Sequence, residues 1–210
     1  MITPESIDLP KFLSAWYGPA TKEETPLSDA CDWLPETLKK WYKLASRWSV
    51  PLESITFLLS PEDIKVENGK ALFMQDAAGD WCWGFDAEDT NSVFDAEFYE
   101  PWEKTRESLP ELIVHRAVKE ALYGAPVQIH ASGVSSGSLP AVLADLDEVG
   151  FEAWRWPGPG YRIFMDHELL LEINPSRHTP EWSLKAAAVT VDRLAGLIDI
   201  PAVSWRNQTR

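Results

Sequence analysis

The stretch from Ala71 to Glu103 constrains the fold most, because it is rich in aromatic and acidic side chains and contains no Lys or Arg. Its aromatic residues are Phe73, Trp81, Trp83, Phe85, Phe94, Phe98, Tyr99 and Trp102. Its acidic residues are Asp76, Asp80, Asp86, Glu88, Asp89, Asp95, Glu97, Glu100 and Glu103. A disordered acidic region contains few aromatic residues. We therefore expect this stretch to be folded, with its carboxylates displayed on a rigid surface.

The whole chain is acidic, with 33 Asp and Glu against 19 Lys and Arg and a formal net charge of −14. Such a charge repels nucleic acids and anionic membranes, and it attracts basic proteins. We therefore expect a basic protein as the partner, and neither a nucleic acid nor a membrane. The predicted partner-binding residues are Asp76, Asp80, Asp86, Glu88, Asp89, Asp95, Glu97, Glu100, Trp102 and Glu103.

Other features of the sequence indicate the cellular compartment and the absence of cofactors. No apolar run has the length that spans a bilayer, and residues 1–6 lack the basic and apolar regions of a secretion signal. The two cysteines, Cys31 and Cys82, form neither a disulfide framework nor a metal-site spacing. We expect a cytoplasmic, non-enzymatic protein without a metal or cofactor.

In the first half of the chain, a β-hairpin is the clearest local pattern. Residues 70–76 and 81–86 are predicted to be two strands joined around residues 77–80, and a two- or four-residue turn between them places Met74 opposite Trp83 and Leu72 opposite Phe85, so that these four share a face. Shorter strands are expected at residues 55–59 and 92–95. Apolar residues at three- and four-residue intervals predict an amphipathic helix at residues 34–48, and a short helix is expected at 11–17.

A second long helix is predicted at residues 108–123. Ser108 and Glu111 have the spacing of a capping box, and Gly124 and Pro126 end the helix. We place a module boundary here, between residues 1–124 and a smaller module at 125–210. The fold class is therefore α+β: an antiparallel β-meander packed against flanking helices, with a second α+β module.

The second module is expected to contain a helix, a three-stranded meander and a final helix. The predicted strands are residues 127–130, a hairpin of 151–156 and 161–165, and residues 168–173. Residues 131–138 predict a linker of small residues, and residues 139–149 and 179–197 predict helices. The tail from Asp199 is expected to be frayed.

Residues 34–122 resemble the SUKH superfamily, which includes the yeast cell-wall assembly and killer-toxin-resistance regulators. The resemblance lies in the helix that opens with Leu34-Pro35, the turn and strand of residues 79–86, the strand of residues 92–95 and the helix of residues 109–122. The Asn-Gly pair that the family carries after its first helix is absent, since residues 47–51 read Arg-Trp-Ser-Val-Pro. The resemblance implies a binding role, because many bacterial members are immunity proteins that neutralise a toxin, often a nuclease.

Two other functions remain alternatives. Residues 133–137 read Gly-Val-Ser-Ser-Gly, which fits the nucleophile elbow of a serine hydrolase, with Ser135 as nucleophile between a predicted strand and a predicted helix. Five small residues in a linker match this pattern easily by chance, so no catalytic residue is predicted. The other alternative is a structural protein that associates with a second copy of itself through tryptophan-rich surfaces.

A calcium loop is a further candidate in the acidic stretch. Asp86, Glu88, Thr90 and Glu97 have spacings that are faintly similar to those of such a loop, but Asn91 stands where its glycine is required. We expect a solvated acidic loop there.

Overall fold

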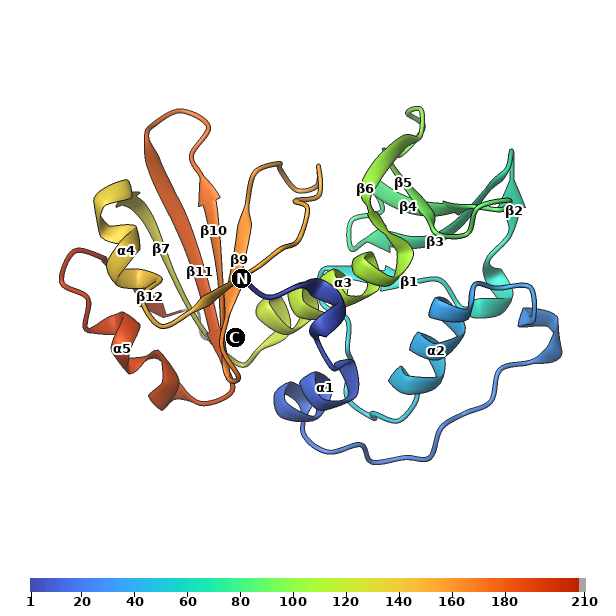
Figure 1. Ribbon diagram of the computed structural model, residues 1–210, viewed down its shortest axis with the longest axis horizontal. Coiled ribbons are helices and arrows are strands. Elements are labelled where there is room, and N and C mark those ends of the chain that lie inside the picture. Colours follow the sequence, from blue (N-terminus) through green and yellow to red (C-terminus); the bar gives the residue numbers. More distant parts are fainter. Residues whose placement is uncertain (208–210) are drawn as a thin grey trace. The chain divides into compact units, whose positions relative to one another are not determined.

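The computed structural model describes residues 1–207, and the chain divides into two compact units (Figure 1). The first unit is Asp8–Glu120, and the second joins Met1–Ile7 to the chain from Ala121 onward. Residues 1–7 are predicted from the sequence to belong to the first module instead. They belong to the second unit because Ile2 forms a parallel bridge with Val149 and its carbonyl oxygen accepts a 2.9 Å hydrogen bond from Gly150.

Both units combine helices with an antiparallel sheet, so the predicted α+β class is confirmed. The first unit carries α1 (Leu9–Tyr17), α2 (Glu36–Ala45), most of α3 (Leu109–Gly124), β1 (Thr56–Leu58), β2 (Val66–Glu67), β3 (Lys70–Asp76), β4 (Trp81–Asp86), β5 (Ser92–Glu97) and β6 (Glu103–Ser108). Its sheet has the order β1-β3-β4-β5-β6, and β2 also pairs with β3. The predicted hairpin is confirmed as β3 and β4.

Helices α2 and α3 lie on one side of this first sheet (Figure 1). The start of α3 carries the predicted capping contact, since the Glu111 carboxylate accepts a 2.7 Å hydrogen bond from the N–H of Ser108. Helix α2 is shorter than predicted and begins at Glu36, after Pro35. Proline suits this place because its missing N–H would be unpaired at a helix start in any case.

A buried carboxylate on α3 fixes the edge strand β1. Glu120 is 1% exposed, and its oxygens accept hydrogen bonds from the backbone N–H groups of Ser54, Ile55 (3.0 Å) and Thr56 (2.8 Å). The hydroxyl of Thr56 donates to the same carboxylate, at 2.5 Å. Three consecutive N–H groups are thereby paired by one side chain, which anchors this segment to the helix.

The second unit consists of one sheet with two short helices. Its elements are β7 (Val127–Ser135), α4 (Leu139–Val142), β8 (Asp147–Val149), β9 (Arg162–Met165), β10 (Leu169–Pro175), β11 (Glu181–Ala188), α5 (Ala195–Ile198) and β12 (Arg206–Asn207). The strand order is β12-β7-β11-β10-β9-β8. Helices α4 and α5 lie on one side of the sheet (Figure 1), where Val142 and Leu197 join its apolar core.

Several predictions for this unit are wrong. The final helix predicted at residues 179–197 is the strand β11 followed by the short α5, and the helix predicted at 139–149 is α4 followed by β8. Residues 151–156 form no strand, so β9 pairs with β8 and β10 instead. Strand β7 runs through the predicted linker as far as Ser135, and the predicted frayed tail contributes β12, which pairs with β7.

The alanine residues of β11 explain why a helix was predicted for this strand. Ala186, Ala187 and Ala188 are all buried in β11, which lies between β7 and β10. A strand covered on both faces does not alternate in polarity, and alanine has a high intrinsic helix propensity. The pairing with two neighbouring strands outweighs that propensity.

Candidate functional site

The two faces of the first sheet have different surroundings. Successive side chains of a strand point to opposite faces, and in β4 the rings of Trp83 and Phe85 are buried. Phe85 lies against Trp33, which precedes α2, with ring centroids 6.2 Å apart. Trp83 and Phe85 therefore face the helices. Cys82 and Gly84 face the other way, and we call that side of the sheet the open face.

A β-bulge decides which residues of β3 reach the open face. Met74 pairs with Trp83 as predicted, but Leu72 pairs with Gly84 and not with Phe85, because the register shifts between Leu72 and Met74. An extra residue in one strand reverses the alternation beyond it. Leu72 is consequently on the open face beside Cys82, while Met74 remains in the core.

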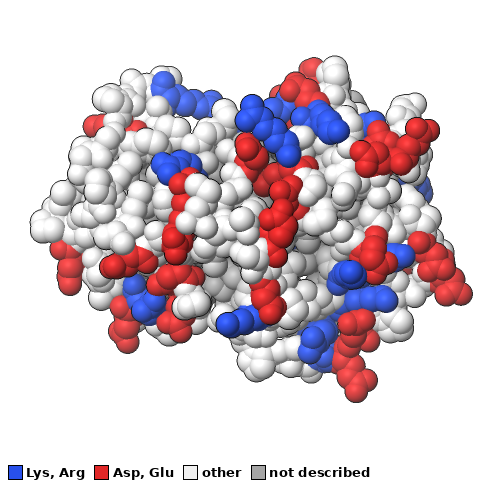
Figure 2. Space-filling model, viewed as in Figure 1, with Lys and Arg blue, Asp and Glu red and all other residues white. Residues whose placement is uncertain are grey.

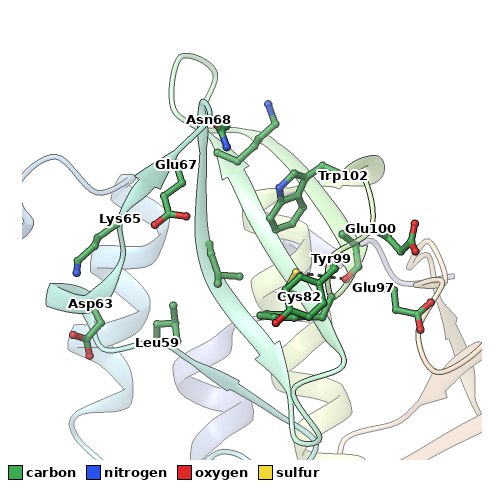
Figure 3. Close-up of a pocket in the computed structure, with 14 residues that line it drawn as sticks. Leu59, Asp63, Lys65, Glu67, Asn68, Cys82, Glu97, Tyr99, Glu100 and Trp102 are labelled. Atoms are coloured by element: carbon green, nitrogen blue, oxygen red, sulfur yellow. Dashed lines mark hydrogen bonds between the residues drawn. The ribbon is translucent and has the colours of Figure 1, made fainter.

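The open face is hollowed into a groove of about 500 Å³ (Figure 3). We call it the open-face groove; its lining residues are Leu59, Asp63, Lys65, Glu67, Asn68, Lys70, Leu72, Cys82, Ala96, Glu97, Phe98, Tyr99, Glu100 and Trp102. Figure 3 shows Asp63, Lys65 and Glu67 on one side and Tyr99 and Trp102 on the other. This volume is within the range of sites that bind small molecules or single side chains.

One wall of the groove is the turn between β5 and β6, which presents two aromatic rings. Tyr99 is 96% exposed and Phe98 is 41% exposed, and their rings meet edge to face with centroids 4.6 Å apart. Tyr99 has a φ of 73°, a left-handed conformation that costs a non-glycine residue free energy. The N–H of Phe98 donates to the carbonyl oxygen of Asp80 at 2.7 Å, which holds the turn against the start of β4.

Carboxylates without an ion-pair partner surround this groove. Within residues 1–207, no Lys, Arg or His lies within ion-pair distance of Asp63, Glu67, Glu97 or Glu100. Two lysines also line the groove, but Lys70 forms a 2.8 Å ion pair with Asp86, which leaves Lys65 alone against the four carboxylates. The groove therefore has a surplus of negative charge beside its exposed rings.

The floor of the groove contains a thiol that is unreactive at neutral pH. Cys82 is 5% exposed, and its Sγ lies 3.5 Å from the carbonyl oxygen of Ala96. Burial raises the pKa of this thiol to about 11, and the charge of Asp95 acts in the same direction. Cys82 is therefore protonated at neutral pH and acts as an apolar floor residue.

Two of the predicted binding residues do not lie on the surface. Asp76 is 3% exposed and closes its own turn, since its carboxylate accepts hydrogen bonds from the N–H groups of Trp81 (2.7 Å) and Ala78 (3.2 Å). Asp95 is 2% exposed. The expectation that the stretch displays all of its carboxylates is wrong for these two, because the turn and the sheet interior enclose them.

The remaining predicted residues separate into two groups. Asp80, Glu97, Glu100, Trp102 and Glu103 lie where β4 begins and β5 gives way to β6. Asp86, Glu88 and Asp89 lie at the opposite end of these strands, in and beside the turn from β4 to β5. Figure 2 shows Lys and Arg side chains among the acidic ones on the face that it displays.

Asp63, Lys65 and Glu67, which form one wall of the groove, are not among the predicted binding residues. A signal for this wall was present, because Asn68 and Gly69, with φ of 52° and 78°, form the tight turn that pairs β2 with β3. An Asn-Gly pair is the strongest short signal for a hairpin. The bulge in β3, which supplies Leu72 to the floor, has no comparable signal in the sequence.

The predicted hydrolase alternative lacks its geometry. Ser135 is the last residue of β7 and is exposed, and within the described chain its hydroxyl forms a side-chain hydrogen bond only with Ser138, at 2.9 Å. The helix that should follow the elbow is the four-residue α4. Across residues 1–207, neither a histidine nor an aspartate side chain is hydrogen-bonded to Ser135, as the nucleophile of a catalytic triad would require.

Comparisons with known proteins find no match from which a family could be assigned to the chain. Across residues 1–207, every helix is too short or too polar to cross a membrane. The chain matches no protein-family model, no curated protein and no solved structure. The SUKH resemblance therefore stays a prediction.

Proposed function

We propose that this protein binds a basic protein through the open-face groove and the turn of residues 97–100. One observation carries the proposal: two exposed aromatic rings, Phe98 and Tyr99, stand between the unpaired carboxylates of Glu97 and Glu100. Exposed aromatic residues that cluster beside a pocket are typical anchors of protein interfaces.

The charge of the site supports a basic partner. The chain has a net charge of −14, and four unpaired carboxylates surround the groove. Complementary charge accelerates encounter and selects the partner, while aromatic rings that become buried on binding supply most of the affinity. A cationic loop that inserts one apolar or aromatic side chain into the groove fits both features.

The most specific form of the proposal is an immunity protein that neutralises a basic toxin, such as a nuclease, in the cytoplasm. The resemblance of residues 34–122 to the SUKH superfamily supports this form, because many of its bacterial members have that role. In this form the protein is a stoichiometric inhibitor and needs no catalytic group of its own.

Affinity capture tests the proposal. Full-length protein is immobilised, and lysate of the native host is passed over it at low salt and at about 0.15 M salt. We expect a basic protein that is retained at low salt and loses affinity as salt rises. The purified pair is then titrated against the wild type and against a Glu97→Gln/Tyr99→Ala/Glu100→Gln variant, which should weaken binding at least 100-fold, as loss of a central anchor does.

The matched control is Glu23→Gln/Glu24→Gln, which removes the same two charges from an exposed loop of the same unit. It should leave the affinity within about threefold, in the manner of rim charges. Equal weakening by both variants would show that net charge alone causes the binding, and the proposed site would be wrong. Protection of cells that express the captured protein would establish the immunity role.

A further inference from the structure

A second hollow lies among the helices of the first unit and is independent of the proposed function. It has a volume of about 550 Å³; its lining residues are Leu9, Pro10, Thr37, Lys40, Trp41, Leu44, Pro110, Ile113 and Val114. They come from the beginnings of α1 and α3 and from the exposed side of α2. We call this hollow the helical groove.

The lining of the helical groove is almost entirely apolar. Trp41 and Ile113 are buried and form its base, while Leu9, Leu44 and Pro110 remain half-buried and open to solvent. Apolar side chains left in this state favour an apolar ligand, because covering them removes their surface from water. The volume lies within the range of small-molecule sites.

One charge distinguishes this groove from the open-face groove. Lys40 is the single charged residue in its described lining, and no carboxylate of residues 1–207 lies within ion-pair distance of its ammonium group. Its neighbour Lys39 is held by Glu36 at 3.3 Å. In a chain of net charge −14, an unpaired cation beside an apolar surface is complementary to a ligand with an apolar body and one negative end.

We infer that the helical groove binds a single-chain anionic amphiphile, of the class of medium-chain fatty carboxylates. The alkyl chain lies on Trp41, Leu44 and Ile113, and the carboxylate pairs with the ammonium group of Lys40. The stem of the lysine lies along the ligand while its charge stays in water, as amphipathic side chains do.

Calorimetric titration of decanoate into the full chain, below the concentration at which decanoate forms micelles, tests this inference. We expect saturable binding of one decanoate per chain. Decanol, which has the tail without the charge, should bind several-fold more weakly, and acetate, which has the charge without the tail, should not bind. An absence of saturable binding, or binding of many decanoates per chain, would overturn the inference.

Variants locate the ligand. Lys40→Glu should weaken decanoate binding about fivefold or more, since it replaces an attraction by a repulsion at the rim. Lys43→Glu makes the same charge change on the same helix outside the lining and should alter the affinity less than twofold. Thr37→Trp fills the groove and should abolish binding, with its folding checked by circular dichroism.

Three results would contradict the assignment. Equal weakening of decanoate binding by Lys40→Glu and Lys43→Glu would show that the net charge of the protein, and not the position of Lys40, determines the affinity. Unchanged binding in a folded Thr37→Trp variant would place the ligand elsewhere. Co-sedimentation with vesicles of anionic phospholipid, without one-to-one decanoate binding, would indicate a membrane surface and not a free amphiphile.

Discussion

The indole ring of Trp102 covers Gly84 so closely that a Cβ atom at residue 84 would lie 3.2 Å from Cη2 of the ring. The same atom would lie 3.2 Å from the carbonyl oxygen of Ala71. A glycine in β4 therefore lets an aromatic side chain approach the backbone of the open face closely, and Trp102 lines the groove there.

Gly84→Ala should destabilise the first unit by about 1–2 kcal/mol, because the added methyl group must displace either the ring or strand β3. Urea unfolding followed by circular dichroism measures the change. In a Trp102→Ala background the same substitution should cost less, because the ring is no longer there to be displaced. If Gly84→Ala lowers the free energy of unfolding equally in both backgrounds, the ring of Trp102 does not constrain residue 84.

The backbone of Tyr99 gives a second prediction. Its φ of 73° suits glycine, so Tyr99→Gly should be more stable than Tyr99→Ala by about 1 kcal/mol, measured by urea unfolding. Both variants should lose affinity for the basic partner, because both lack the exposed ring. Equal stability of the two variants would show that the turn relaxes to an unstrained conformation.

Among the carboxylates of the first unit, Glu120 is expected to be the one whose substitution lowers the free energy of unfolding most. Glu120→Gln places an amide NH2 group against N–H donors of residues 54–56, so we expect a loss of about 2–4 kcal/mol in the free energy of unfolding. Glu23→Gln, at an exposed position in the same unit, should change it by less than about 0.5 kcal/mol. A comparable effect of both substitutions would contradict the anchoring role of Glu120.

The ion pair of Lys70 and Asp86 predicts that the stability of the fold depends on pH in the acid range. The hydrogen bond from Lys70, together with those from the N–H groups of Glu88 and Asp89, lowers the pKa of Asp86 to about 2. A carboxylate whose pKa is lower in the folded than in the unfolded chain stabilises the fold above the unfolded pKa. This contribution should be complete above about pH 4 and should be lost as the pH falls to about 2.

Asp86→Asn keeps an oxygen for the turn and removes the charge. Its stability should therefore vary less between about pH 4 and pH 2 than that of the wild type. Carboxyl NMR titration of Asp86 provides the direct measurement. A midpoint near the ordinary value of 3.8 would contradict the strength of the ion pair with Lys70.

The first unit was largely predictable because its local signals agree with its tertiary contacts. Strands β3 and β4 have the predicted bounds, and α3 begins beside the predicted cap at Ser108. The groove was less predictable. Its floor depends on the bulge beyond Leu72, and the burial of Asp76 and Asp95 depends on turn and sheet contacts that residue type does not reveal.

In the second unit, local signals conflict with the fold. Residues 184–188 combine leucine, lysine and alanine, which favour a helix in isolation. They form a strand because β7 and β10 lie on either side and supply the backbone partners. Helix propensity decides the structure of a segment only where few neighbouring strands are available for pairing, and β11 has two such strands.

The bridge between Ile2 and Val149 makes the first unit an insertion within the second, joined to it by two covalent connections. During translation, Ile2 is synthesised before Val149 and cannot pair with it until residue 149 has left the ribosome. The inserted unit, Asp8–Glu120, has by then been synthesised completely. Its hairpins need only residues close along the chain, so it can fold while the surrounding sheet still awaits its last strands.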